Sequence, residues 1–372
     1  MRVATLQFNP QVGQVAANFS RAESLLMRDE REGLLQGLDL LVLPELAFTG
    51  YNHPSLSAIA PYLEPTAAGP STRWASRTAK RLKCTVAVGY PEAAEEGNYN
   101  TIYDEKILAQ DGAIAYNSMV VVSSTGDVVA HHRKAFLYYT DETWAKEGKG
   151  FYAGVIPIGA NGQQTKVAAG ICMDINPYKF EAPWTAYEFG NHCRDSRAKI
   201  VILSTAWLTH LSHEELRDQP TVPDMSTVGY WIERFRPLMA DATGSDQDVI
   251  LVIANRCGAE GSAHRIGDVK YAGSSTILSI RKGQNVRIWD IFGRSQEGVL
   301  LVDTTLPARF TIAPKTPHSS DATVEEDEAV HKASRRDSST LAVDGQDHYQ
   351  QEYVTQQQAL NAGRHTGLDP SE

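Results

Sequence analysis

The stretch LDLLVLPEL, residues 38–46, is an apolar run that ends at Pro44 and the glutamate after it. Runs without polar alternation are typical of strands buried on both faces, and proline stops them because it has no amide hydrogen to donate. Segments with apolar residues at helical spacing lie on either side of it, at 18–37 and 71–83. Further runs of the same kind are KVAAGICMD (166–174), AKIVILSTAW (198–207) and DVILVIANRCG (248–258). Strands that alternate with helices along the whole chain predict an α/β fold.

Shorter patterns add strands to this frame. RVATLQF (2–8) and TVAVGYPE (85–92) are rich in β-branched residues. Residues 100–134 predict two long neighbouring strands, because turn sequences stand at Asp111-Gly112 and Gly126-Asp127.

The composition of the chain changes near Pro314. Residues 1–313 carry the strand and helix patterns and predict one globular domain. Residues 314–372 hold eleven acidic and five basic side chains and few apolar ones. Such a segment buries too little surface to offset its ordering entropy, so we expect an acidic, polar, disordered tail with at most a short helix at 349–360.

Charge and cysteine content argue against several classes of function. The formal net charge of −10 disfavours a nucleic-acid partner. The four cysteines form no C-x-x-C pair, so neither a zinc knuckle nor a thioredoxin-like redox site is expected, and we predict no metal and no cofactor. The start MRVATLQFNP lacks the pattern of a secretory signal, and no run is long and apolar enough to predict a membrane span. These features predict a cytoplasmic protein with free thiols.

Polar residues stand where the apolar strands end. Glu45 follows LLVLP, Lys134 follows VVAHHR, Cys172 follows VAAGI, and Trp207 follows VILSTA. Sites in open α/β sheets lie at the carboxyl ends of strands, so this placement predicts a functional site. Taken singly, each residue has a plainer interpretation: Cys172 as a small core residue, Glu45 as a turn cap, and Lys134 as part of a solvated basic turn.

Taken together in their contexts, these residues resemble a known family. LLVLPELAFTGY (40–51), GDVVAHHRKAFL (126–137) and VAAGICMD (167–174) resemble the nitrilase superfamily of carbon–nitrogen hydrolases, and LSTAW, ANRCGAE and YAGSSTIL are weaker matches. The resemblance covers nearly all of residues 1–313. It implies a nitrilase-like four-layer α-β-β-α sandwich, often dimerised through one helical layer, so both a monomer and a homodimer stay open.

The resemblance also implies an amidohydrolase acting on linear amides with a Glu-Lys-Cys triad. Cys172 would be the nucleophile, activated by the Lys134 charge and by Glu45 as base. Lys134 and the backbone N–H of Met173 would stabilise the oxyanion, and Glu45 would then protonate ammonia and activate water. Glu142, eight residues after the lysine, is expected to orient Lys134. Its plainer interpretation is an exposed loop acid.

The residues that follow the nucleophile indicate a substrate. GICMDINPYKFEAPWTAYEFG (170–190) resembles a fungal branch of the superfamily that deamidates N-terminal asparagine and glutamine in proteins, which would feed N-degron protein degradation. Asp174 could pair with the ammonium group of such a peptide, and Asn176 could add a hydrogen bond. Trp207 could wall the pocket. Alternatively, Asp174 caps the following segment through backbone hydrogen bonds.

Two other functions stay open on the sequence. The same machinery fits a small-molecule amide or carbamoyl substrate, of which free glutamine is one. A non-catalytic scaffold whose acidic tail recruits partners belongs to a different class, and the intact Glu45, Lys134 and Cys172 speak against it.

Overall fold

The computed structural model of the 372-residue chain describes residues 1–94, 114–240, 248–260, 269–281 and 286–312. The strand expected before residue 114, with its turn at Asp111-Gly112, lies outside the described residues. The tail expected at 314–372 and its short helix also lie outside them.

Two sheets of seven strands each form the centre of the molecule. In spatial order the first sheet contains β15 (Gly298–Asp303), β1 (Arg2–Gln7), β2 (Leu40–Val42), β4 (Thr85–Ala94), β5 (Ile114–Val122) and β6 (Val128–Arg133), with β3 (Glu64–Pro65) beside β4. Strands β1, β2 and β4 are parallel, whereas β15, β5 and β6 run antiparallel to their neighbours. The predicted strands at 2–8, 38–46 and 85–92 are the three parallel ones.

The second sheet is built in the same way around three parallel strands. In spatial order it contains β16 (Phe310–Ile312), β14 (Val286–Ile291), β13 (Thr276–Ile280), β10 (Val249–Asn255), β9 (Ile200–Thr205), β8 (Gln163–Ile171) and β7 (Tyr152–Ile158). The parallel strands β8, β9 and β10 correspond to the three apolar runs predicted from the sequence. A separate antiparallel pair consists of β11 (Ala259–Glu260) and β12 (Val269–Lys270).

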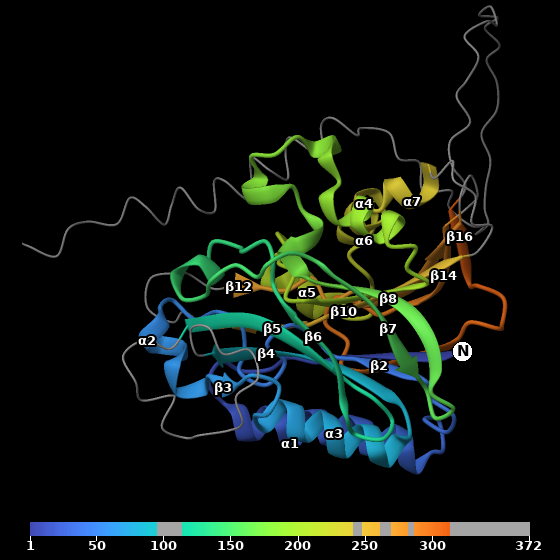
Figure 1. Cartoon of the computed structure of the whole chain (residues 1–372), viewed down its shortest axis with the longest axis horizontal. Helices are drawn as coiled ribbons and strands as arrows, with labels where there is room; N and C mark the ends of the chain where they lie inside the picture. Colours follow the sequence, from blue (N-terminus) through green and yellow to red (C-terminus); the bar gives the residue numbers. More distant parts are fainter. Residues whose placement is uncertain (95–113, 241–247, 261–268, 282–285, 313–372) are drawn as a thin grey trace, which may run out of the picture.

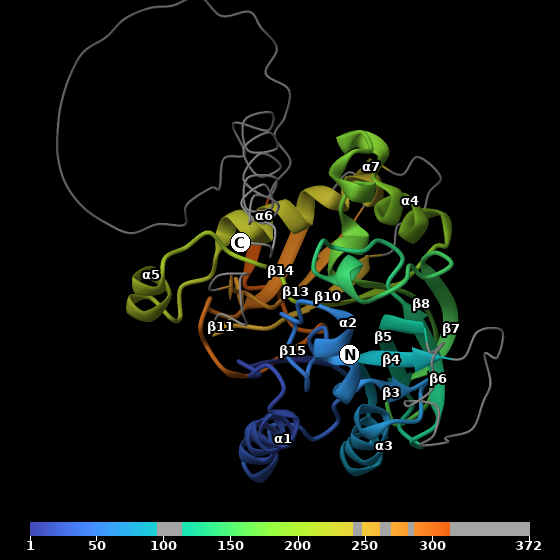
Figure 2. The same ribbon diagram turned by 90° about the vertical axis from the view of Figure 1, so that its left-hand side faces the viewer.

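Helices cover the outer face of each sheet (Figure 1). On the first sheet lie α1 (Val15–Arg31) and α3 (Pro70–Leu82), and on the second lie α4 (Glu188–Asp195), α6 (Met225–Arg234) and α7 (Arg236–Ala240). A quarter turn shows the two helical layers again on opposite sides of the sheets (Figure 2). This arrangement confirms the predicted α/β class and the four-layer α-β-β-α sandwich. No helix in the described ranges is both long enough and apolar enough to span a bilayer.

Short helices lie in the loops between these strands and helices. Two are α-helical, α2 (Leu56–Ile59) and α5 (His213–Asp218). The others are single 3₁₀ turns: η1 (Ala60–Tyr62), η3 (Asp141–Thr143), η4 (Cys172–Ile175), η5 (Tyr178–Phe180) and η6 (Trp184–Ala186).

The apolar run at 38–46 packs on both faces of the first sheet. Leu40 and Val42 belong to a core that is shared with β9 and β10 of the second sheet. Leu41 and Leu43 belong to the core under α1 and α3. All four side chains are fully buried. Because apolar layers cover both faces of β2, its sequence shows no polar alternation.

Candidate active site

Glu45, Lys134 and Cys172 meet at the carboxyl ends of strands from both sheets. Glu45 stands just after β2, Lys134 directly follows β6, and Cys172 directly follows β8. Lys134 Nζ lies 2.6 Å from Glu45 Oε1. The side chains of Glu45 and Lys134 are fully buried, and Cys172 is 8% exposed. The cluster therefore lies between the two sheets.

The second carboxylate on Lys134 is that of Asp141, not of the predicted Glu142. Asp141 Oδ2 lies 2.5 Å from Lys134 Nζ and also accepts the backbone N–H of Tyr138 at 3.0 Å. The two acidic residues begin η3, a 3₁₀ turn in which successive side chains point about a third of a turn apart. Asp141 is buried and faces the site, whereas Glu142 is exposed to solvent. The prediction that Glu142 orients Lys134 is therefore wrong.

Two further groups hold the Glu45 carboxylate. Asn117 Nδ2 donates to Glu45 Oε1 at 2.6 Å and to Asp141 Oδ1 at 3.0 Å. The backbone N–H of Ala206, just after β9, donates to Glu45 Oε2 at 2.8 Å. Neither group was singled out in the sequence. For Asn117 the available signal was its polar side chain in the middle of the largely apolar strand β5.

Burial and neighbouring charges set the protonation of this cluster. Burial raises the pKa of Glu45, the Lys134 charge lowers it and the Asp141 charge raises it again, so that the net shift is upward. Burial alone would lower the pKa of Lys134, but the Asp141 and Glu45 carboxylates outweigh burial and raise this pKa above its ordinary value. Lys134 is therefore an ammonium held between two acidic side chains.

Cys172 sits on a strained turn. Its φ of 43° lies in the left-handed region, which non-glycine residues adopt at a cost and which often marks functional sites. Burial and the Glu45 charge raise the pKa of the Cys172 thiol, while the Lys134 charge and a hydrogen bond from the Ala206 backbone lower it by less. The resting Cys172 side chain is thus a neutral thiol.

Asp174 does not face the pocket. Its Oδ1 accepts the backbone N–H groups of Ala135 and Phe136, each at 2.9 Å. Its Oδ2 accepts the backbone N–H of Ile171 at 2.8 Å and lies 2.9 Å from His132 Nε2. The side chain is fully buried, and all of these partners belong to the protein. The prediction of Asp174 as the ammonium-binding residue is therefore wrong. The alternative is right in that Asp174 accepts backbone hydrogen bonds, but these come from Ile171, Ala135 and Phe136 and not from the following segment.

Instead, Asp174 joins the two sheets at the site. Its four partners come from the segment around Lys134 in the first sheet and from the end of β8, just before Cys172, in the second sheet. Because hydrogen bonds to a charged acceptor are stronger than neutral ones, Asp174 fixes the position of Cys172 relative to Lys134.

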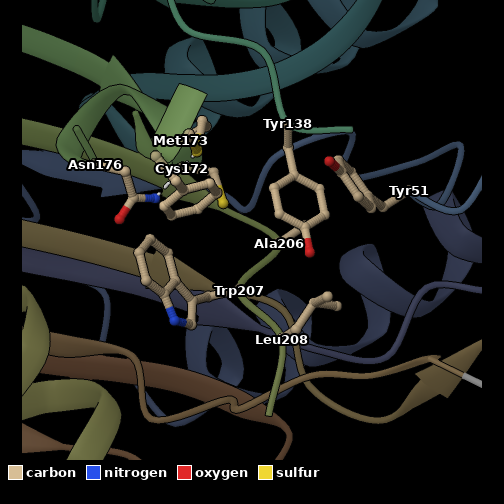
Figure 3. Close-up of a pocket in the computed structure, with 9 residues that line it drawn as sticks. Tyr51, Tyr138, Cys172, Met173, Asn176, Ala206, Trp207 and Leu208 are labelled. Carbon is tan, nitrogen blue, oxygen red and sulfur yellow. Dashed lines mark hydrogen bonds between the residues drawn. The ribbon is translucent and has the colours of Figure 1, made fainter. Parts of the chain in front are cut away.

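A small pocket opens above Cys172 (Figure 3). The predicted residues Met173, Asn176 and Trp207 line it together with Cys172. Asn176 Oδ1 accepts the hydroxyl of Tyr230 at 2.5 Å. The remaining lining residues were not predicted from the sequence: Tyr51, Tyr138, Phe180, Ala206 and Leu208. Among the described residues, the lining is mostly apolar and aromatic and contains no ionised side chain. In the described ranges no group of three or more His, Cys, Asp or Glu side chains is placed to hold a metal ion.

Known proteins share this sequence pattern. The family model for carbon-nitrogen hydrolases matches residues 2–177. The protein N-terminal amidase of Schizosaccharomyces pombe is 30% identical over 315 residues, which cover 81% of this chain and 98% of that protein. The protein N-terminal amidase of Saccharomyces cerevisiae is 30% identical over 225 residues, which cover 57% of this chain and 46% of that protein.

Solved structures share the fold. A crystal structure of an N-terminal amidase with a Gln-Gly peptide superposes with a TM-score of 0.68 at 23% identity, covering 81% of this chain and 96% of that one. The same amidase was solved with an Asn-Glu peptide, with the same TM-score and coverage. These likenesses confirm the nitrilase-like sandwich predicted from the resemblance.

Proposed function

This chain belongs to the carbon–nitrogen hydrolase family, and we propose that it hydrolyses the side-chain amide of an N-terminal asparagine or glutamine in peptides and proteins. The products would be N-terminal aspartate or glutamate and ammonia, which would feed degradation that reads N-terminal residues. The S. pombe N-terminal amidase supports this proposal, because the alignment covers 98% of its length. One structural observation carries the chemistry: a buried ammonium, Lys134, bridges Glu45 and Asp141 beside the Cys172 thiol.

The first half-reaction forms a thioester. The Cys172 thiol gives its proton to Glu45 while the sulfur attacks the amide carbon. Lys134 has three N–H donors and uses two on the carboxylates, which leaves one for the carbonyl oxygen as it becomes negative. The backbone N–H of Met173 is the second donor we propose. The C–N bond then breaks, and the proton on Glu45 passes to the departing ammonia.

The second half-reaction returns the enzyme to its starting state. Water replaces ammonia, and Glu45 takes a proton from it while the oxygen attacks the thioester carbon. The C–S bond breaks, and the proton on Glu45 returns to the Cys172 sulfur. One carboxylate serves as base and acid in turn because the two half-reactions alternate.

The apolar pocket favours a peptide over a free amino acid. Free glutamine carries an α-carboxylate, and a carboxylate that enters an uncharged lining without a cation loses its hydration uncompensated. A peptide has a neutral amide bond in that position. Its remaining charge, the N-terminal ammonium, suits aromatic faces such as that of Trp207 and the Asn176 carbonyl oxygen.

An ammonia-release assay tests the proposed function. We expect release from peptides that begin with Asn or Gln, and about tenfold less from their N-acetylated twins, because a tenfold change corresponds to about 1.4 kcal/mol and one desolvated cation contact is worth about that much. We also expect about tenfold less release from free glutamine, because its α-carboxylate loses hydration in the uncharged lining. Cys172→Ser is the inactive control. Equal release from the acetylated peptides would contradict N-terminal recognition, and faster turnover of free glutamine would favour the small-molecule alternative.

A further inference from the structure

Asn117 is a neutral side chain that hydrogen-bonds both carboxylates beside Lys134. It lies on β5, fully buried, and its Nδ2 donates to both Glu45 and Asp141. Its backbone carbonyl accepts the N–H of Lys134 at 2.8 Å. Carboxylate oxygens can only accept, so the amide nitrogen and not its oxygen must face them. Asn117 Oδ1 is left buried without a hydrogen-bond partner among the described residues, an arrangement that costs stability.

The two oxygens of Glu45 have different surroundings as a result. Oε1 accepts from Lys134 Nζ and from Asn117 Nδ2, each at 2.6 Å. Oε2 accepts only the Ala206 N–H among the described contacts. Ala206 lines the same pocket as Cys172, and its backbone lowers the pKa of the Cys172 thiol. Oε2 is therefore the oxygen on the side of the nucleophile, and it has room for a proton.

We propose that Asn117 is a positioning residue that occupies Oε1 of Glu45 and so directs the catalytic proton to Oε2. Two donors on Oε1 make a proton there unfavourable, because an incoming hydrogen would face the hydrogens of Lys134 and Asn117. A proton on Oε2 can pass between the thiol, the leaving ammonia and the attacking water without the carboxylate rotating. This inference rests on the hydrolase chemistry proposed above and not on which amide is the substrate.

Asn117 also affects the protonation of Glu45. The titratable and charged groups that act on Glu45 and Cys172 from the surrounding elements are those of Lys134, Asp141, Tyr51, Tyr230 and Tyr271. Lys134 supplies one positive charge against two carboxylates. The hydrogen bond from Asn117 lowers the pKa of Glu45 and so helps to keep this base ionised in the resting enzyme.

Steady-state kinetics of Asn117→Ala provide the first test. We expect kcat to fall about 10- to 100-fold with KM within about twofold, because the amide touches the base and not the substrate. Ser118→Ala is the matched control: Ser118 is the next residue of β5, equally buried, and its hydroxyl donates to Glu92. We expect its kcat within about twofold of wild type.

The pH dependence separates positioning from simple loss of structure. Loss of the Asn117 hydrogen bond should raise the Glu45 pKa, so the acid limb of kcat/KM should move to higher pH in Asn117→Ala and stay in place in Ser118→Ala. The rate at which iodoacetamide alkylates Cys172 should show the same displacement without any substrate. The alkylation rate can be measured even if the enzyme turns over no peptide with N-terminal Asn or Gln. That result would contradict the proposed function and leave the role of Asn117 testable.

Asn117→Ser covers the case in which the alanine variant does not fold. Its hydroxyl can donate one hydrogen bond and not two, so we expect a kcat and an acid limb between those of wild type and Asn117→Ala. A folded variant of either kind with wild-type kcat and an unmoved acid limb would overturn the proposal. An equal loss in Ser118→Ala would overturn it too.

Discussion

At the scale of single residues, Asp141 and Glu142 are neighbouring acidic residues whose side chains point in different directions. Asp141 contacts Lys134, and Glu142 points to solvent. We expect Asp141→Asn to lower kcat/KM about 10- to 100-fold, because Lys134 loses a charged partner that orients it, and Glu142→Gln to stay within about twofold of wild type. Steady-state kinetics of the two variants on one substrate measure the difference.

The pH profile gives this pair a second readout. The Asp141 charge raises the pKa of Glu45, so its removal should move the acid limb of kcat/KM to lower pH. This displacement is opposite in sign to the one expected for Asn117→Ala. A Glu142→Gln variant as impaired as Asp141→Asn would show that the exposed carboxylate, too, acts on the lysine.

These residues also show how far sequence patterns predict the candidate site. Glu45, Lys134 and Cys172 stand at the ends of apolar runs, and such runs are visible without a structure. Which of Asp141 and Glu142 contacts Lys134 depends on how the three-residue turn η3 is rotated. No periodic pattern in the sequence determines this rotation. Asp174 was misassigned because two of its partners, the backbone N–H groups of Ala135 and Phe136, are distant in sequence.

At the scale of elements, the turn after β8 depends on Asp174. We expect Asp174→Asn to lower the free energy of unfolding by about 2–4 kcal/mol, because an amide NH₂ would face N–H donors that now contact a carboxylate oxygen. Denaturant titration of the full chain measures the loss. Asn176→Ala is the contrast: its side chain lines the pocket, so we expect a raised KM with a smaller loss of stability.

The opposite pattern would restore the substrate role of Asp174. If it bound the peptide ammonium, Asp174→Asn would raise KM about tenfold or more and leave the free energy of unfolding unchanged.

Elements with strong periodicity were predicted well, and weakly patterned ones were not. The expected helix at 18–37 is α1, but it ends at Arg31, and Gly33 and Gly37 then adopt φ values of 73° and 68° in the following turns. Strand β15 was not singled out, although it pairs with β1 across almost the whole chain, with Arg2 opposite Asp303. Such pairing depends on tertiary packing, and a short stretch of sequence around β15 carries no information about it.

At the scale of the whole molecule, the site exists only when the two sheets pack together. The Ser204 hydroxyl of the second sheet donates to the Leu43 carbonyl of the first at 2.6 Å, beside the Ala206 bond to Glu45. Glu45 and Lys134 come from one sheet and Cys172 from the other. In the proposed mechanism the four-layer arrangement is therefore part of the catalytic apparatus, because it sets the distance between the Cys172 thiol and the Glu45 carboxylate.

The stability of the whole molecule should depend on pH through Glu64. This side chain is 4% exposed, and Ser71 donates to it through its backbone N–H at 2.8 Å and its hydroxyl at 2.6 Å. Burial raises the pKa of Glu64 from 4.5 to about 7. The folded protein therefore binds this proton more tightly than the unfolded chain does, and the free energy of unfolding should fall as pH rises from 4.5 to about 7.

The Glu64 contribution should reach at most about 3.4 kcal/mol, since one unit of pKa corresponds to about 1.36 kcal/mol. Glu64→Gln keeps the shape and removes the titration, so its unfolding free energy should decline less between pH 5 and pH 7.5 than that of wild type. Part of the decline should persist, because the pKa of Glu45 is also raised. Urea titrations at the two pH values measure both slopes. Identical slopes for wild type and Glu64→Gln would show that Glu64 stays ionised in the folded protein, with Ser71 and solvent compensating for its burial.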